Sequence, residues 1–431
     1  MFKKKKTYLV PFLGFILLSI IGAILLYLPI CNKQDITFLD SLYTSVSTVT
    51  GTALLKSPIV EQFNLIGQII IAILMEIGAV GFIVFISYIW SKRNKKMQIS
   101  DLVMVNENTS GDNNYNLVKE HSVFVINFVL RIQIIGAILL SIRFVPEYGI
   151  LKGIWYGIFH SISAFTNVGY DILGTNSLCN YSKDYYLLTI IFILMLLGSI
   201  GIFAIEDIKN NKSRKFKKLK LQTKIILVYS FALIVIPAIL LKIFEDNISL
   251  FNSLFMSLTA RSAGFSSINI ESFSNASKLL LMLLMFIGGS PSSTAGGIKV
   301  IITAIIISTV VSTFRGRSNT IIFWKKIPAQ TVRKSFAVFM SFMSLAILAA
   351  IMLAHTNNTV GLLEVLFESI SALSNAGLTL VTAPTSSIIG DLILLELMLI
   401  GRIGPIAMIM VFVPDEPIDK LVEYPTENVN L

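Results

Sequence analysis

The chain has 431 residues, of which 54% are apolar and only 14% are charged, and its mean hydropathy is +0.77. Soluble proteins carry about a quarter charged residues, so this composition excludes an ordinary soluble domain and indicates a polytopic membrane protein. The net charge of +10 does not indicate nucleic-acid binding, because the basic residues lie in short clusters between apolar runs. Cys31 and Cys179 are far apart, which supports neither a disulfide framework nor a zinc site.

Apolar runs long enough to cross a membrane recur along the whole chain. The first follows the lysines at 3–6 and is too long for a signal-peptide core, so we interpret it as a transmembrane helix. We predict eight transmembrane helices, at residues 8–29, 64–90, 122–144, 186–206, 222–243, 277–313, 334–355 and 388–413. The two members of each pair are separated by a segment of roughly 10 residues, which is too short to cross.

This short segment is an internal repeat. Residues 159–169 read FHSISAFTNVG, residues 366–377 read LFESISALSNAG, residues 254–264 read LFMSLTARSAG, and residues 42–51 read LYTSVSTVTG. Four copies at a spacing of about 100 to 120 residues indicate a fourfold repeat. The predicted fold class is therefore an all-α polytopic membrane protein with four helix, pore loop, helix repeats around a central pore.

The repeats divide the chain into six parts. The first repeat covers 1–96, a cytoplasmic loop 97–120, the second repeat 121–211, the third 212–320, the fourth 321–413, and a cytoplasmic tail 414–431. Lysine and arginine clusters lie in the connections between repeats, on the same side as the N-terminal lysines. By the positive-inside rule, both termini are predicted to be cytoplasmic in a multi-pass protein of the cell membrane, and the short segments to enter from outside.

The chemistry of the repeated segment indicates cation passage. Non-helical backbone at membrane depth is tolerated only where it is buried in protein or lines water. A ring of backbone carbonyls can replace the hydration shell of K⁺, and glycine lets successive carbonyls turn inward. A single copy would be read as a helix C-cap, but four matching copies favour a selectivity filter. The C-terminal ends of short helices also favour a cation over an anion.

The sixth apolar run contains an interruption. Residues 288–299 read GGSPSSTAGGIK, and glycine and proline are the poorest helix residues. We predict a break that acts as a gate below the filter, the alternative being a packed kink. The candidate gate residues are Gly288, Gly289, Ser290, Ser292, Ser293, Thr294, Gly296, Gly297 and Lys299. A phosphate-binding loop is excluded, because no strand precedes the segment and it lacks the terminal Gly-Lys-Ser/Thr.

Four charged residues lie within or near the apolar runs. Arg402 is assigned either to electrostatic tuning below the filter or to pairing with the gate segment, and a snorkelling side chain is the alternative. Glu76 and Glu396 either act in the same way as Arg402, near the ion pathway, or pair with a neighbouring helix. Glu368 either faces the outer vestibule and attracts cations or caps its helix.

The repeated unit, residues 288–299, the GRIGP stretch at 401–405 and the EYP ending at 423–425 together resemble the Trk/Ktr/HKT superfamily of potassium transporters. The resemblance covers essentially the whole chain and is strongest to the membrane subunit of a Ktr-type system. It implies potassium uptake without enzymatic activity, and a homodimer with one pore per protomer. It also implies a cytoplasmic ring of regulatory subunits that bind ATP or ADP. K⁺, with Na⁺ as a further candidate, is the transported ion, the surroundings are membrane lipid, and no organic cofactor is expected.

The resemblance also carries over the ion-binding residues. They are Thr50, Gly51, Thr52 and Ala53 in the first copy, Thr166, Asn167, Val168 and Gly169 in the second, Ser262, Ala263 and Gly264 after Arg261 in the third, and Ser374, Asn375, Ala376 and Gly377 in the fourth. The pore-facing arginine is Arg402.

The first copy departs from the others. The glycine comes eight residues after the opening serine in the second and fourth copies and seven in the third, but Gly51 comes only six after Ser45. The first turn is therefore either residues 48–51, or residues 50–53 with Ala53 at the glycine place.

In plant relatives a non-glycine residue at this place goes with sodium permeation, so an HKT-like transporter of sodium, or of sodium and potassium, is the alternative function. A secondary transporter with a midplane site is a further alternative, which would require inverted repeats and paired broken helices, whereas only one helix is predicted to be broken.

Overall fold

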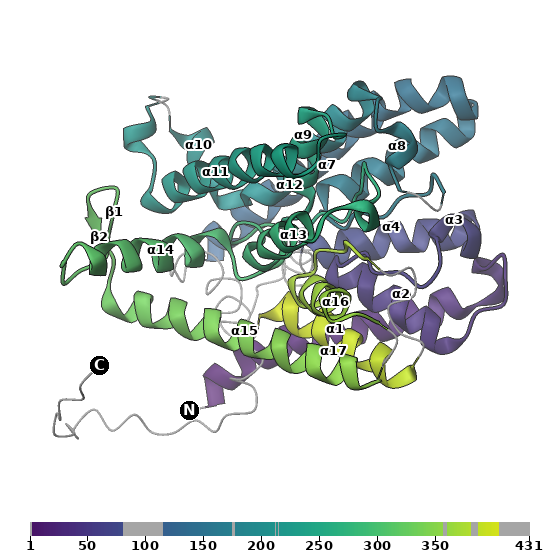
Figure 1. Ribbon diagram of the computed structural model, residues 1–431. Helices are drawn as coiled ribbons and strands as arrows, with labels where there is room; N and C mark the ends of the chain where they lie inside the picture. The colour runs from purple at the N-terminus through teal and green to yellow at the C-terminus, as the bar shows by residue number, and fades with distance from the viewer. Residues whose placement is uncertain are drawn as a thin grey trace.

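The computed structural model describes residues 2–80, 115–174, 177–211, 213, 215–356, 360–380 and 387–404, and these are almost entirely helical (Figure 1). The two strands of the described chain, β1 (Ile321–Ile322) and β2 (Lys325–Lys326), form a small antiparallel hairpin with Ile321 opposite Lys326. The predicted tail at 414–431 lies outside the described residues. The predicted loop 97–120 lies outside them up to 114, and a helix already begins at Tyr115.

The main helices follow one order four times: a long helix, a shorter helix ending in a turn, and a third helix. The first group is α1 (Phe2–Tyr27), α2 (Phe38–Thr50) and α4 (Leu65–Val80), and the second is α7 (Tyr115–Tyr148), α8 (Ile150–Phe165) and α9 (Tyr185–Ile200). The third is α11 (Leu221–Phe244), α12 (Leu250–Thr259) and α13 (Asn275–Ile287), and the fourth is α15 (Ala329–Thr356), α16 (Leu362–Ser374) and α17 (Ile388–Ile403).

Short elements join the main helices. They are α3 (Ile59–Gln62), α10 (Ile202–Asn210), α14 (Val300–Phe314) and the 3-10 turns Pro29–Cys31, Cys179–Tyr181, Phe216–Lys218 and Ile270–Ser272. Side chains begin several helices: the Thr37 hydroxyl accepts from Asp40 N at 3.2 Å, and Asp184 accepts from Leu187 N at 3.0 Å. Such caps satisfy N–H groups that the first helical turn leaves unpaired.

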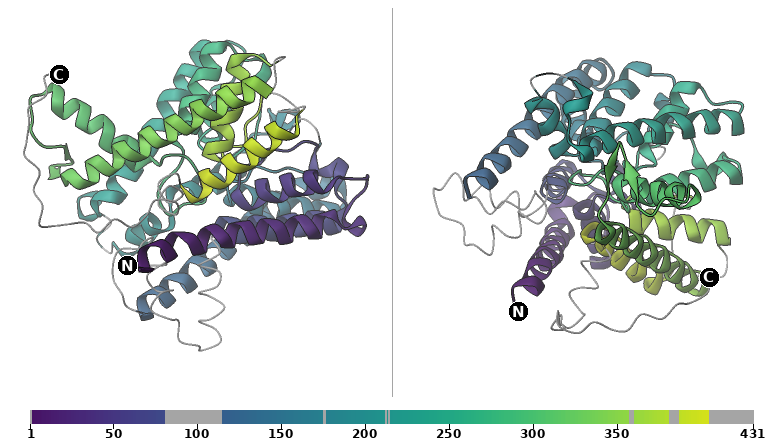
Figure 2. Two further views of the ribbon diagram at one scale, coloured as in Figure 1. Left: turned by 90° about the horizontal axis from the view of Figure 1, so that it is seen from below. Right: turned by 90° about the vertical axis from the view of Figure 1, so that its left-hand side faces the viewer.

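The four groups close into a ring. α4 contacts α8, α9 contacts α12, α13 contacts α16, and α17 returns to contact α2 and α1. Figure 2 shows this closure in its left view, where the yellow α17 lies beside the purple N-terminal helices. The four short helices α2, α8, α12 and α16 therefore have neighbours on both sides within the ring.

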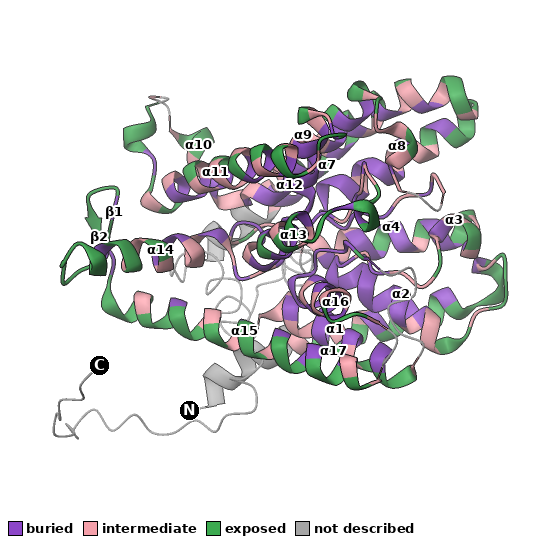
Figure 3. Cartoon of the chain, viewed as in Figure 1, coloured by how far each residue is buried: buried purple, intermediate pink, exposed green. Residues whose placement is uncertain are grey.

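Burial follows this arrangement. The helix α2 is buried from Tyr43 to Thr50, whereas large apolar side chains on the long helices are exposed, such as Leu17, Phe231 and Ile351 at 55%, 69% and 62% (Figure 3). Exposed apolar helix faces of this extent fit a lipid environment. Among the described residues, three helices are long and apolar enough to span a membrane, namely Val123–Tyr148, Leu221–Phe244 and Ala329–Thr356, with a fourth if the bent pair α9 and α10 is one span. The predicted spans 8–29, 64–90 and 277–313 overlap shorter apolar helices, and parts of 64–90 and 388–413 lie outside the described residues, so the count of eight stays a prediction.

One expectation about broken helices is wrong. The sixth apolar run is interrupted between Ile287 and Val300 as predicted, but the fourth is also bent, by 88° between α9 and α10. The bend lies at Gly201, whose φ is 88°, and Ile202 N donates to Ser292 O of the interrupted segment at 3.2 Å. The argument against a secondary transporter from a single broken helix therefore fails. The second argument against a secondary transporter, that all four groups run in the same order, does not depend on this bend.

Candidate functional site

The turns that end α2, α8, α12 and α16 share one backbone conformation. Each has two residues with positive φ separated by one residue: Gly51 and Ala53 (72° and 60°), Asn167 and Gly169 (53° and 85°), Ser262 and Gly264 (88° and 73°), and Asn375 and Gly377 (50° and 80°). By conformation, Gly51 therefore matches Asn167, and Ala53 matches the three glycines. Of the two registers that the sequence leaves open for the first turn, this pattern favours residues 50–53.

The four turns meet at one place. A Cβ on Gly169 would lie 2.0 Å from Ala263 O in the third turn, and one on Gly264 would lie 3.1 Å from Ala53 Cβ in the first. A Cβ on Gly377 would lie 2.1 Å from Thr52 O and 2.8 Å from Ala53 Cβ. All four segments singled out from the sequence are thus brought together, and a side chain at any of the three glycines would collide with a neighbouring turn.

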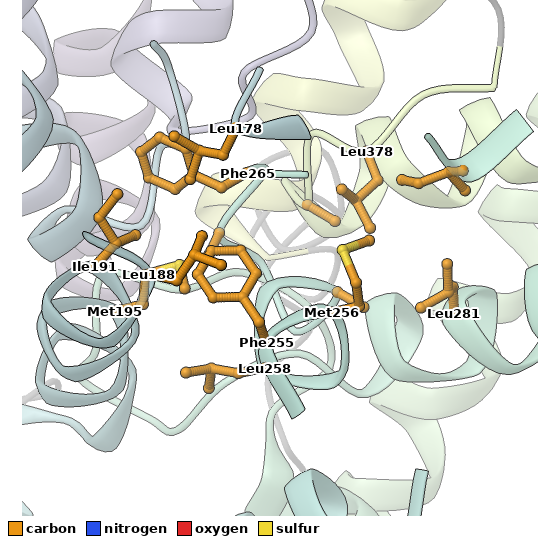
Figure 4. Packing of buried hydrophobic residues seen from close by; sticks show 14 of the residues in the cluster. Leu178, Leu188, Ile191, Met195, Phe255, Met256, Leu258, Phe265, Leu281 and Leu378 are labelled. Carbon is orange, nitrogen blue, oxygen red and sulfur yellow. The ribbon is translucent and has the colours of Figure 1, made fainter. Parts of the chain in front are cut away.

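Buried side chains directly behind the turns fix their position. The residue after each turn is almost fully buried: Leu54, Tyr170, Phe265 and Leu378 are at most 1% exposed. Figure 4 shows Phe265 and Leu378 within one apolar cluster that also contains Phe255, Met256 and Leu281. Because protein interiors are close-packed, these anchors limit how far the turns can move.

Hydrogen bonds hold the turns to their own helices and to each other. The hydroxyls of Thr50, Thr166 and Ser374 donate to carbonyls four residues earlier at 2.7, 2.7 and 2.6 Å. The Asn375 amide donates to Thr52 Oγ1 at 2.8 Å, and Ser262 Oγ donates to Asn375 O at 2.6 Å. The fourth turn is therefore bonded to the first and the third.

The third turn differs, because Arg261 stands where the others have a hydroxyl. Its side chain is 1% exposed, and its Nε donates to Gly288 O at 3.1 Å while Nη2 donates to Ser230 Oγ at 3.2 Å. It therefore ties the third turn to α11 and to the first residue of the interrupted segment.

The interrupted segment, residues 288–299, packs directly against the turns. Gly296 N donates to Ser262 Oγ at 2.8 Å, and Thr294 Oγ1 lies 2.7 Å from the Asn167 amide. A Cβ on Gly296 would lie 2.0 Å from Ser374 O, and Gly288 and Gly297 are similarly pressed together. Ser290 is fully buried, Ser292 is exposed and Ser293 is intermediate. Of the remaining candidates, Gly289 N donates to Gly296 O at 3.1 Å, and Lys299 Nζ donates to Ala295 O.

Arg402 connects this segment to the first group. Its Nη1 donates to Thr294 O at 2.6 Å, and its Nη2 donates to Gly78 O at 2.7 Å. A Cβ on Gly51 would lie 3.7 Å from Nη1, so the guanidinium is also close to the first turn. These bonds match the expectation of pairing with the interrupted segment and not that of a snorkelling side chain.

The three glutamates have different environments. Glu76 accepts from Gln133 Nε2 at 2.7 Å and so pairs with a neighbouring helix, while Glu396 is exposed on α17. Glu368 is only 3% exposed and accepts from the backbone N–H of Leu380 at 2.9 Å. Neither role expected for Glu368 matches these contacts, because the carboxylate is buried and bonds to the chain beyond its own turn.

Sequence reasoning missed a second set of glycines. A Cβ on Gly78, Gly198 or Gly401 would lie 2.2, 2.0 or 1.9 Å from Val49 O, Phe165 O or Leu373 O, each of which is the residue directly before its turn. The third helix of these groups therefore presses its backbone against the end of the short helix. Comparing the glycines in the third helix of each repeat, and not only those in the turns, would have found them.

These features define a multi-pass helical membrane protein in which four turns meet at one place, and comparisons with known proteins identify its family. Residues 5–424 match the TrkH family, described as cation transport protein. The chain is similar to the potassium/sodium uptake protein NtpJ of Enterococcus hirae, at 32% identity over 97% of this chain and 95% of the relative. It is also similar to the Ktr system potassium uptake protein B of Bacillus subtilis, at 32% identity with the same coverage. The crystal structure of the potassium transporter TrkH from Vibrio parahaemolyticus has the same fold, with a TM-score of 0.75 and 17% identity over 95% of this chain and 85% of that one. The chain therefore belongs to the TrkH family of cation transporters, which are not enzymes.

Proposed function

We propose that this chain mediates potassium uptake across the cell membrane through a pore lined by the four turns. The observation that carries the proposal is that four segments with the same pair of positive-φ residues converge at one place. Turns of this kind present successive backbone carbonyls, which replace the hydration shell of K⁺. The names of the similar proteins, a potassium/sodium uptake protein and a potassium uptake protein, support the same ion class.

In this proposal the four groups of helices are repeats of one helix, pore loop, helix unit, with boundaries near 1–96, 121–211, 212–320 and 321–413. The ends of the short helices direct the negative ends of their peptide dipoles toward the ion. The membrane potential supplies about 2.3 kcal/mol per elementary charge per 100 mV, which supports roughly fiftyfold accumulation without covalent chemistry. Coupling to sodium is a separate property that the flux measurement below resolves.

The interrupted segment is the proposed gate. Thr294 contacts the second turn, Gly296 contacts the third and fourth turns, and Arg402 bonds the segment to α4. Withdrawing the segment would break these bonds together, so the bonds favour the closed arrangement. An element held by a few such bonds can switch between two states when a partner stabilises the other one.

Sodium permeation is a second candidate function, and Ala53 favours it. This residue carries a methyl group at the place where the other turns have glycine, and that methyl lies against the positions of Gly264 and Gly377. A side chain here changes the spacing available to the first turn's carbonyls and weakens the argument for strict potassium selectivity.

The proposed assembly is a homodimer in lipid, with a separate regulatory ring that binds ATP or ADP on the cytoplasmic side. The similarity to protein B of a Ktr system supports a multi-component arrangement. Basic residues such as Lys217, Lys218, Lys325 and Lys326 lie at the end of the molecule that carries α10 and the β1–β2 hairpin (Figure 1), which supports a cytoplasmic location of that end.

The direct test is growth of a bacterium lacking its own potassium uptake at micromolar K⁺, with the chain expressed together with its regulatory subunit. Purified protein in liposomes, loaded with K⁺ or Na⁺ and assayed for flux of each ion alone and together, then separates uptake of K⁺ from permeation of Na⁺ and from coupling. Rescue with K⁺ flux supports the proposal. No rescue, with correctly inserted protein and regulator present, would contradict it.

A further inference from the structure

The buried carboxylate of Glu368 joins α16 to the chain just beyond the fourth turn. Its Oε1 accepts from Leu380 N at 2.9 Å and from Thr379 Oγ1 at 2.6 Å. A buried carboxylate is costly unless hydrogen bonds satisfy it, and bonds to an ionised acceptor are stronger than neutral ones. The outer side of the fourth turn is thereby held to the helix that precedes the turn.

The same position makes a comparable contact in two other groups. The residue before the opening serine is Thr44, His160, Met256 or Glu368. Ile172 N donates to His160 Nε2 at 3.5 Å, and Ser266 Oγ lies 3.9 Å from Met256 Sδ. Counted from the last residue of the turn, Ile172 corresponds to Leu380, and Ser266 corresponds to Thr379. The acceptor thus changes from carboxylate to imidazole to thioether, while the place of the contact stays the same.

The first group holds its outer chain differently. Lys56, the third residue after Ala53, pairs with Asp40 Oδ1 of α2 at 2.9 Å and with Asp391 Oδ2 of α17 at 2.5 Å. The first group therefore also uses an acceptor on its short helix, but Asp40 is near the start of α2, and the same lysine adds an ion pair to the fourth group. Among the three groups in which the residue before the opening serine makes the contact, Glu368 makes the most strongly polar one.

We propose that Glu368 is a positioning residue that fixes the outer side of the fourth turn and thereby sets the preference for K⁺ over Na⁺. The turn is held from within by the bond from Ala376 N to Ser371 O at 2.9 Å, and from outside by the Glu368 carboxylate. Without the outer contact, the carbonyls of the turn can move inward around a smaller ion. The selectivity part rests on the function proposed above, whereas the contact itself does not.

Three variants remove increasing parts of the contact. Thr379→Val removes only the hydroxyl bond, Glu368→Gln keeps an acceptor oxygen but removes the charge, and Glu368→Ala removes both bonds. Glu364→Ala is the matched control, because Glu364 lies on the same helix one turn earlier. Two quantities are measured on protein in nanodiscs or liposomes: hydrogen exchange of the peptide containing Leu380, and the ratio of K⁺ to Na⁺ flux.

We expect Glu368→Ala to raise exchange at Leu380 and to lower the K⁺/Na⁺ ratio, each by roughly tenfold, since a hydrogen bond to a charged group is lost. Glu368→Gln and Thr379→Val have smaller effects, and Thr379→Val adds nothing in the Glu368→Ala background. Glu364→Ala changes neither quantity. If Glu368→Ala does not fold, the test rests on exchange at Leu380 and the flux ratio in Glu368→Gln and Thr379→Val, which keep the side-chain volume.

Unchanged exchange at Leu380 in these variants would refute the contact. Raised exchange with an unchanged flux ratio would refute its role in selectivity. If the wild-type protein carries neither ion while exchange still rises on substitution, the proposed function and the selectivity role fail and the contact stands.

Discussion

Replacing Gly377 with alanine tests whether the meeting of the four turns is essential for transport. Gly377 has a φ of 80°, and a Cβ there would lie 2.1 Å from Thr52 O and 2.8 Å from Ala53 Cβ. The left-handed backbone costs alanine about 1–2 kcal/mol, and overpacking against backbone adds about 1–3 kcal/mol. The native arrangement of the turns should therefore be disfavoured by about 2–5 kcal/mol.

Gly149 provides a control, because its φ is 81°, its ψ is 169° and nothing lies within 4 Å of a Cβ built there. Gly149→Ala therefore carries a backbone cost at least as large as that at Gly377, without the collision. At about 1.4 kcal/mol per tenfold, Gly377→Ala should lose K⁺ flux by roughly tenfold or more beyond any loss in Gly149→Ala. The assay is ion flux into liposomes at equal amounts of inserted protein. Equal flux from the two variants would refute the convergence of the turns as the basis of transport.

Three further predictions concern other parts of the site. Ala53→Gly should raise the K⁺/Na⁺ flux ratio, because it restores glycine at the fourth equivalent position, and an unchanged ratio and rate would place Ala53 outside the filter. Arg402→Gln should raise flux measured without any regulatory subunit, because it removes the bonds that hold Thr294 O to α4. Gly401→Ala should lower the free energy of unfolding by about 1–3 kcal/mol, which thermal denaturation would measure, since its Cβ would lie 1.9 Å from Leu373 O.

The last two predictions need different controls. Arg315→Gln removes a charge at the exposed end of α14 and should leave basal flux unchanged, so an equal rise in both arginine variants would contradict a specific role for Arg402. For Gly401→Ala the reference is the wild-type chain, because Gly401 lies within α17 and alanine there adds no backbone strain of its own. An unchanged stability of Gly401→Ala would show that the close backbone contact is absent.

Local chemistry explains why much of the fold could be predicted. The helices follow from long apolar runs, and the interruption at 288–299 follows from glycine and proline, whose effects on backbone depend on few neighbours. The repeated serines are also readable locally, and their role is now visible: Ser45 Oγ donates to Ser19 O and Ser161 Oγ to Gln133 O, both at 2.7 Å. Ser257 Oγ likewise donates to Ile234 O of α11 at 2.9 Å, so three short helices are bonded to the long helix of their group, whereas Ser369 Oγ donates to Val365 O of its own helix at 2.8 Å.

The remaining features depend on contacts between residues far apart in the chain. The bend at Gly201 could not be read from an apolar run, because its partner is Ser292, and Glu368 could not be assigned, because its partner Leu380 lies beyond the turn. The alternation of four similar segments with apolar helices was predictable, since apolar pattern and glycine placement act locally. The equivalence of Ala53 to the three glycines depends on the packing of the turns, because a positive φ in alanine persists only where the surrounding turns impose it.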